Sequence, residues 1–324
     1  MRTLRTSTRG FGWRLQRLAR RGRRMFCSRL YRDTVTDPAR TILVAGTARS
    51  GTTWLADLIA SQLPARVMFE PFNPRLVRAY AAFNYFQYMQ PGVENAALYE
   101  VVQRILSGRI RDPWIDREVD ILRPQWRIIK EIRACLFLRW LHDHFPEVPI
   151  FFIIRHPCAV VASRLQLGWA TDGDLQPLLE QQPLLDQFLG DHLDMIRGVK
   201  TDAEKHAILW CVSNMVPLAQ FSDIGLNTVF YEDLCSRPER VIPAIFDTLG
   251  SPWSDTVFSY ARRPSMTTAR HSALFDEAGH ISAWRRVLST ADIARIRAVT
   301  DEFGLGHLYG DDDLPVHLPA NEEV

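Results

Sequence analysis

The sequence is poor in several residue types that often reveal a protein's chemistry. Lysine occurs only at Lys130, Lys200 and Lys205, so arginine carries most of the positive charge. The five cysteines are dispersed and form no Cys-x-x-Cys pair or Cys/His cluster with metal-ligand spacing, which favours a reduced compartment. No apolar run approaches the roughly 18 residues of a membrane span. We therefore expect a cytoplasmic chain that needs no metal and does not cross a membrane.

Acidic residues are absent from the first 32 residues, which hold eleven arginines. Since the whole chain has 39 Lys+Arg and 37 Asp+Glu, the remainder has 28 basic against 37 acidic residues. This basic segment carries apolar residues near helical spacing, which suits peripheral contact with an anionic membrane surface. The composition also fits a disordered tail, a targeting segment or unspecific attraction to nucleic acid. We expect a basic N-terminal arm at 1–40, a domain at 41–310 and an acidic tail at 311–324.

After the arm, short β-branched or aromatic runs alternate with helical periods, as in a parallel sheet with crossover helices. The predicted strands are 41–46, 66–70, 127–132, 149–155 and 226–231. The predicted helices are 52–63, 133–145, 157–167, 203–221, 238–249 and 290–303. The fold class is therefore α/β, with a P-loop-like, mostly parallel sheet flanked by helices and a helical insert after the second strand. Inserts in such folds commonly decorate the ligand-binding edge, so we expect residues 72–126 to recognise a ligand.

The first candidate site is the turn Gly46-Thr-Ala-Arg-Ser-Gly51 between a predicted strand and a predicted helix. Such a turn points backbone N–H groups and the positive helix end at one place, which suits an oxyanion. The spacing Gly46-x₄-Gly51 is that of a Walker A loop, but Thr52 stands where that loop has lysine. This departure argues against an ATPase or kinase. A glycine-rich turn without a ligand is the simpler alternative.

The second candidate site follows the buried run Phe151–Ile154, where Arg155-His-Pro157 leads into a helix that carries Ser163. An arginine at the carboxyl end of a strand can bind a phosphate through two donors, and a nearby hydroxyl adds a third. Taken alone, an arginine at a strand edge and a serine on a polar helix face would be ordinary surface residues. Together with the glycine-rich turn, they indicate a ligand with phosphates at both ends.

The segments GTARSGTTWL, IIRHPCAVVASRL and Tyr231-Glu-Asp-Leu234 resemble the sulfotransferases that use 3′-phosphoadenylyl sulfate (PAPS). The resemblance covers about residues 41–290 and implies an enzyme with PAPS as co-substrate. It implies contacts with the 5′-phosphosulfate from Arg49, Ser50, Gly51, Thr52 and Thr53, and with the 3′-phosphate from Arg155 and Ser163. Tyr231 would lie near the adenine. Trp284 resembles a C-terminal tryptophan that closes over the donor, and Arg270 would add a phosphate contact.

The pair RSGTTW and Phe69-Glu-Pro71 resembles the carbohydrate sulfotransferases, which implies a saccharide or glycolipid acceptor and Glu70 as general base. Pro71 disfavours the helical region for Glu70 and favours an extended conformation. Lys130 and Arg133 match a Lys-x-x-Arg feature of the same relatives, and Lys130 would stabilise the transferring group with Arg49. The alternatives are that Glu70 is an ordinary acid at a strand end and that the cations pair with Glu131 or Asp120.

Two other functions remain open at this point. One is a P-loop nucleotide kinase or NTPase. The other is a non-catalytic protein that binds anions or a membrane through the same turn and the basic arm.

Overall fold

The computed structural model describes residues 22–169, 175–261, 281–310 and 312–316. Five strands form one sheet in the order β2-β3-β1-β4-β5, and each neighbouring pair is parallel. The strands are β1 (Thr41–Ala45), β2 (Ala65–Phe69), β3 (Trp126–Glu131), β4 (Ile150–Ile154) and β5 (Asn227–Phe230). Most strand residues are buried, as expected when helices cover both faces of a parallel sheet. The predicted α/β class and the five strand positions are confirmed.

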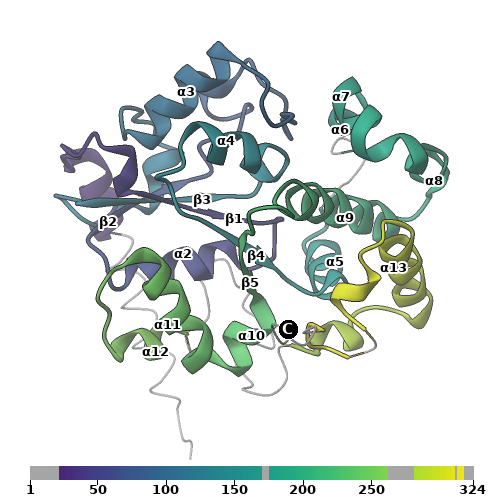
Figure 1. Cartoon of the computed structure of the whole chain (residues 1–324). Helices are drawn as coiled ribbons and strands as arrows, with labels where there is room; N and C mark the ends of the chain where they lie inside the picture. The colour runs from purple at the N-terminus through teal and green to yellow at the C-terminus, as the bar shows by residue number, and fades with distance from the viewer. Residues whose placement is uncertain (1–21, 170–174, 262–280, 311, 317–324) are drawn as a thin grey trace, which may run out of the picture.

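Twelve α-helices lie wholly within the described ranges, and residues 22–30 are helical as well (Figure 1). They are α2 (Thr52–Ala60), α3 (Ala96–Leu106), α4 (Leu138–His144), α5 (Pro157–Gln166), α6 (Gln176–Leu179), α7 (Gln182–Leu184), α8 (Leu193–Gly198), α9 (Asp202–Gln220), α10 (Tyr231–Ser236), α11 (Pro238–Leu249), α12 (Thr256–Ala261) and α13 (Thr290–Glu302). All six predicted helices are present. The first half of the predicted 133–145 helix is a 3₁₀ turn, Ala134–Phe137. The sequence did not predict α6–α8, α10 or α12, which are short, and the predicted helical insert contains α3.

Two hydrophobic cores lie on opposite faces of the sheet because side chains alternate along each strand. Leu43 and Phe152 point into a core with α3, α4, α5, α9 and α13. Val44 and Phe151 point into a second core with α2 and α11. Strands β2 and β3 lie on one side of β1, whereas β4 and β5, which come later in the chain, lie on its other side. The strand order therefore reverses between β1 and β4. Parallel sheets bind ligands at the carboxyl ends of the strands at such a reversal.

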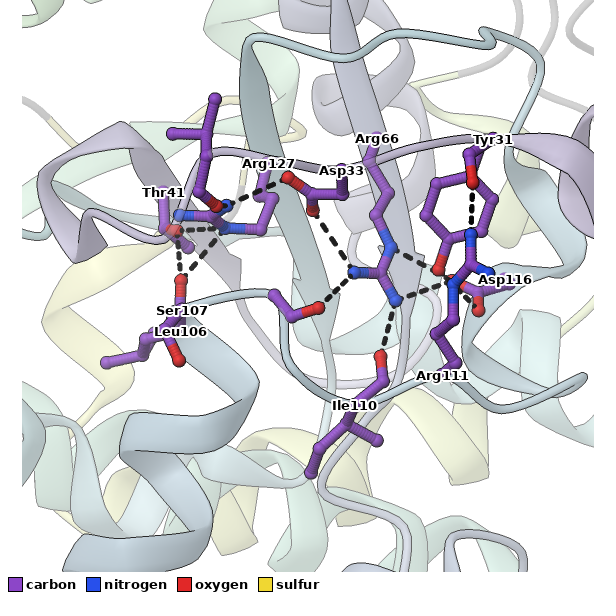
Figure 2. Close-up of polar contacts among 12 residues, drawn as sticks. Tyr31, Asp33, Thr41, Arg66, Leu106, Ser107, Ile110, Arg111, Asp116 and Arg127 are labelled. Carbon is purple, nitrogen blue, oxygen red and sulfur yellow. Dashed lines mark hydrogen bonds and ion pairs between the residues drawn. The ribbon is translucent and has the colours of Figure 1, made fainter.

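The amino ends of β1, β2 and β3 carry a buried polar network instead (Figure 2). Arg66 and Arg127 are register partners on β2 and β3, and both are fully buried. Asp33 lies between them, 3.2 Å from a guanidinium nitrogen of each. Asp116 pairs with Arg66 at 2.8 Å and accepts a 2.9 Å hydrogen bond from the hydroxyl of Tyr31. The last part of the predicted 1–40 arm is therefore bound to the domain by buried charge.

We expect Asp33→Ala to lower the free energy of unfolding by about 3–5 kcal/mol, because it leaves two buried guanidiniums without the carboxylate that they share. Urea denaturation followed by circular dichroism measures the loss. Glu147→Ala, at an exposed position, is the matched control and should change stability by less than about 0.5 kcal/mol. Equal midpoints for the two variants would show that the segment is a dispensable arm.

Candidate active site

The turn between β1 and α2 is packed so tightly that only glycine fits at two of its positions. A Cβ atom on Gly46 would lie 2.4 Å from the carbonyl oxygen of Ile153 on β4. Gly51 has φ +107°, and a Cβ there would lie 2.7 Å from the ring of Tyr231. The two glycines therefore let the turn approach β4 and the start of α10, which brings three segments distant in sequence together.

The same turn presents donors that suit an oxyanion. Gly51 is the N-cap of α2, supplies no side-chain cap, and is followed by a first turn without acidic residues. The hydroxyl of Ser50 is fully buried and has no hydrogen-bond partner within the described part of the chain. Arg49 has φ +75°, an uncommon conformation for a residue other than glycine. The first N–H groups of a helix have no partner within the helix, so together with a buried hydroxyl they suit an anion. Thr52 is buried at the start of α2, and Thr53 is half-buried beside it.

Arg49, Arg155 and Ser163 meet beside this turn. The Nε of Arg49 donates a 2.9 Å hydrogen bond to the hydroxyl of Ser163 on α5, and Nη1 of Arg155 donates a 3.2 Å bond to the carbonyl of Arg49. The Nε of Arg155 is buried without a partner among the residues described. Burial and then the positive charge of Arg155 lower the pKa of Arg49. Two guanidiniums that repel one another would be stabilised by a bound anion.

Tyr231 lies beneath one of these cations. The guanidinium of Arg155 lies 4.3 Å from the centre of its ring, and Trp54 packs against the ring at 5.2 Å. The tyrosine is buried, and burial raises its pKa despite the nearby charge of Arg155. Tyr231 begins α10 and does not end the strand. Its contact with an adenine stays a prediction.

Arg164 is a site residue that the sequence did not reveal. It lies next to Ser163 and is buried, and its Nη2 donates to the hydroxyl of Thr47 at 2.5 Å and to the carbonyl of Ala48 at 3.1 Å. Arg164 thus holds the turn at residues 46–51, the predicted phosphate turn, from the α5 side. No local pattern distinguishes it from a surface arginine, because only the folded turn supplies its acceptors.

Glu70 follows β2 and binds two cations from β3 and the residues after it. Its carboxylate lies 2.5 Å from Nζ of Lys130 and 2.7 Å from Nη1 of Arg133. Arg133 also donates a 2.7 Å hydrogen bond to the hydroxyl of Tyr85 in the insert. Glu131 instead accepts three backbone N–H bonds, including one of 2.9 Å from Phe72. The two cations therefore pair mainly with Glu70, although Arg133 also lies 4.0 Å from Glu131.

The prediction of an extended Glu70 is wrong, because its φ is +47°. Its N–H donates a 2.8 Å bond to the carbonyl of Lys130, and its side chain binds the ammonium of the same residue. These long-range bonds override the local preference set by Pro71. Burial acts to raise the pKa of Glu70, but Lys130 and Arg133 outweigh it and hold the pKa below its ordinary value. Glu70 is therefore ionised at neutral pH.

A cavity of about 410 Å³ joins the two parts of the site. The turn contributes Thr47 and Ala48, and Arg133, which pairs with Glu70, also lines the cavity. The other lining residues are Tyr85, Phe86, Ile132, Arg164, Gly168, Trp169, His206, Leu209 and Ser213. Of the predicted ligand-recognising insert, Tyr85 and Phe86 reach this cavity. A bound molecule could therefore contact the turn and the Glu70 cluster at once.

Trp284 packs against the residue that follows Arg155. It is buried, and its ring stacks on His156 with centroids 4.7 Å apart and planes 16° from parallel. Its contact with a donor stays a prediction, and Arg270 lies outside the described residues.

Across the described ranges, no group of three or more His, Cys, Asp or Glu side chains could hold a metal ion. No helix there has the length and apolar character that crossing a bilayer requires.

We expect Glu70→Gln to destabilise the fold at pH 7 by about 1.5–3 kcal/mol, the range for hydrogen bonds to charged groups. Because the pKa of Glu70 is depressed in the folded state, its contribution is present above the ordinary value of 4.5 and is lost as pH falls through the folded pKa. The difference between variant and wild type should therefore shrink below pH 4.5. Urea titrations at pH 7, 5 and 3.5 measure it, with the largely exposed Glu94→Gln as control. A difference independent of pH would show that Glu70 is not held as an ion.

Comparisons with known proteins find the following similarities. The curated protein named Nodulation protein NoeE of Sinorhizobium fredii (strain NBRC 101917 / NGR234) is 29% identical over 226 residues, 66% of this chain and 51% of that protein. The chain thus spans about half the length of that relative. A sulfotransferase domain from the curacin biosynthetic pathway has 14% identity and a TM-score of 0.42, covering 81% of this chain and 96% of its own. Mouse sulfotransferase SULT7A1, solved in complex with PAP, has 15% identity and a TM-score of 0.43, with coverages of 83% and 86%.

The sequence profile of the sulfotransferase family matches residues 41–255, which contain the phosphate turn, Glu70, Lys130, Arg155, Ser163 and Tyr231. This match covers well over half of the chain, and the chain belongs to the sulfotransferase family.

Proposed function

We propose that this sulfotransferase takes its sulfuryl group from PAPS. The observation that carries the proposal is the contact of the two predicted phosphate sites: Arg155 bonds the backbone of Arg49, whose own guanidinium bonds Ser163. The turn at residues 49–53 would hold the 5′-phosphosulfate, and Arg155 with Ser163 would hold the 3′-phosphate. Family membership and Thr52 at the lysine position of a Walker A loop disfavour the nucleotide kinase alternative.

The proposed acceptor is a hydroxyl of a saccharide or glycolipid. The cavity beside the phosphate turn supports this proposal, because it combines aromatic rings with hydrogen-bond donors. Tyr85, Phe86 and Trp169 supply faces on which a sugar ring can pack, and Arg133 and Ser213 supply polar contacts. Small-molecule sites commonly pair such apolar walls with a few polar groups that fix orientation.

Glu70 is the proposed general base. The acceptor oxygen attacks sulfur, its proton passes to the carboxylate of Glu70, and the bond from sulfur to the phosphate oxygen breaks as the bisphosphate leaves. Arg49 and Lys130 would stabilise charge on the sulfuryl oxygens and the leaving phosphate. At rest Lys130 and Arg133 keep Glu70 ionised but weakly basic. If Lys130 turns toward the sulfuryl group during transfer, Glu70 loses one cation and its affinity for the proton increases.

Incubation with ³⁵S-labelled PAPS and a panel of glycans, glycolipids and peptides tests the reaction and the acceptor class. On the best acceptor, we expect Glu70→Gln to lower kcat by about 10²–10⁴-fold, the usual contribution of a general base. Its affinity for adenosine 3′,5′-bisphosphate, measured by calorimetry below its unfolding temperature, should stay close to wild type. Full turnover by the variant would exclude Glu70 as the base, and Glu180→Gln, at an exposed position, is the control.

We also propose that the N-terminal helical segment contacts an anionic membrane surface. Residues 22–30 are helical, and Cys27 lies on the buried face, where Arg24 pairs with Glu118. The opposite face exposes Met25, Phe26 and Leu30, which are 60%, 57% and 54% accessible. An apolar face beside a segment with eleven arginines and no acids suits a bilayer with anionic headgroups.

We expect the protein to sediment with vesicles that contain phosphatidylglycerol and not with phosphatidylcholine vesicles, and salt should weaken the binding. The triple change Met25→Ser, Phe26→Ser and Leu30→Ser should reduce the bound fraction severalfold. The matched control changes three comparably exposed residues elsewhere: Leu76→Ser, Val93→Ser and Ile224→Ser. Equal effects of the two triple variants, or equal binding to both vesicle types, would overturn this proposal.

A further inference from the structure

The peptide group between Arg155 and His156 is held on both of its edges by buried side chains. Its carbonyl accepts a 2.9 Å hydrogen bond from Nε1 of Trp210 on α9. Its N–H donates a 3.0 Å bond to the carboxylate of Glu232 on α10. Trp210 and Glu232 are 0% and 1% exposed. The plane of this peptide, and with it the direction in which Arg155 leaves the backbone, is therefore fixed by two other helices.

The start of α10 holds the side chain of the same arginine. Tyr231, which precedes Glu232, lies under the Arg155 guanidinium at 4.3 Å. Two consecutive residues thus contact Arg155 and its backbone, one through the side chain and one through the peptide. The arginine is constrained at both ends before any ligand is present.

The C-terminal segment completes this arrangement. The hydroxyl of Tyr309 donates a 2.8 Å bond to the second oxygen of Glu232. The ring of His156 lies between Trp284, stacked at 4.7 Å, and the edge of Tyr309 at 4.9 Å. Trp284 and Tyr309 therefore pack against the segment that follows Arg155, although both lie more than a hundred positions later in the sequence.

The stability of the fold does not by itself explain why Glu232 is buried. Its two oxygens contact a peptide N–H and a phenol, and burial raises its pKa to about 7 even though these bonds and Arg155 act to lower it. A buried carboxylate bonded to neutral donors stabilises a fold poorly. It does place a strong acceptor at the one peptide N–H that sets the path of Arg155.

We propose that Glu232 is a positioning residue that, with Trp210 and Tyr309, aims Arg155 at the 3′-phosphate of the donor. This inference rests on the proposed function, since it takes the Arg155 site to bind that phosphate. Glu232 touches no substrate in this proposal. It acts only through the Arg155–His156 peptide, so its effect should disappear when the guanidinium of Arg155 is absent.

A double-mutant cycle on adenosine 3′,5′-bisphosphate affinity tests the proposal. We expect Glu232→Ala to weaken binding about tenfold, which equals about 1.4 kcal/mol. Combined with Arg155→Ala, it should cause no further loss beyond that of Arg155→Ala alone. Glu232→Gln should remain within about threefold of wild type, because its amide oxygen still accepts the His156 N–H and the Tyr309 hydroxyl can accept from its NH₂. In the transfer reaction, Glu232→Ala should raise KM for PAPS and leave kcat nearly unchanged.

The outcomes separate this inference from the function on which it rests. No bisphosphate binding by wild type would overturn both. Wild-type binding with an unaffected Glu232→Ala variant, or with equal losses in the two Arg155 backgrounds, would overturn the positioning role alone. Should Glu232→Ala fail to fold, Trp210→Phe removes the donor on the other edge of the peptide and gives the same cycle. Exposed Glu239→Ala is the control and should bind as wild type does.

Discussion

The approach of two guanidiniums at one crevice is the constraint around which the site is organised. Arg49 comes from the turn after β1 and Arg155 from the residue after β4, and the reversal of strand order makes these segments neighbours. Burial and the nearby Arg155 charge depress the pKa of Arg49, so the arrangement costs free energy without an anion. Glycine at positions 46 and 51 is what lets the backbone come close enough for this contact.

Around Glu70, by contrast, the positive charges have a carboxylate partner. Glu70 pairs with both Lys130 and Arg133 within a cluster that is almost completely buried. The cavity is lined by Arg164, which holds the turn, and by Arg133, which pairs with the ionised carboxylate of Glu70.

The buried polar groups at the two ends of the sheet differ in whether the chain supplies their partners. The amino ends of β2 and β3 bury Arg66 and Arg127 against Asp33, a network whose partners are all supplied by the chain (Figure 2). At the carboxyl ends, the hydroxyl of Ser50 and the Nε of Arg155 are buried without partners within the described residues. Buried polar groups normally have a partner, so these two atoms are candidates for contact with a ligand.

The sequence by itself determined the strands, the long helices, the phosphate turn and the presence of Glu70 and Arg155 at strand ends. These features are local: short β-branched or aromatic runs, helical periodicity and a glycine-rich turn can each be recognised within about twenty residues. Tertiary structure alone decided that Lys130 pairs chiefly with Glu70, that Glu70 adopts a positive φ, that Arg164 holds the turn, and that Glu232 and Trp210 clamp the peptide after Arg155. Each of these contacts joins segments whose proximity depends on the order of the five strands, and no local pattern encodes that order.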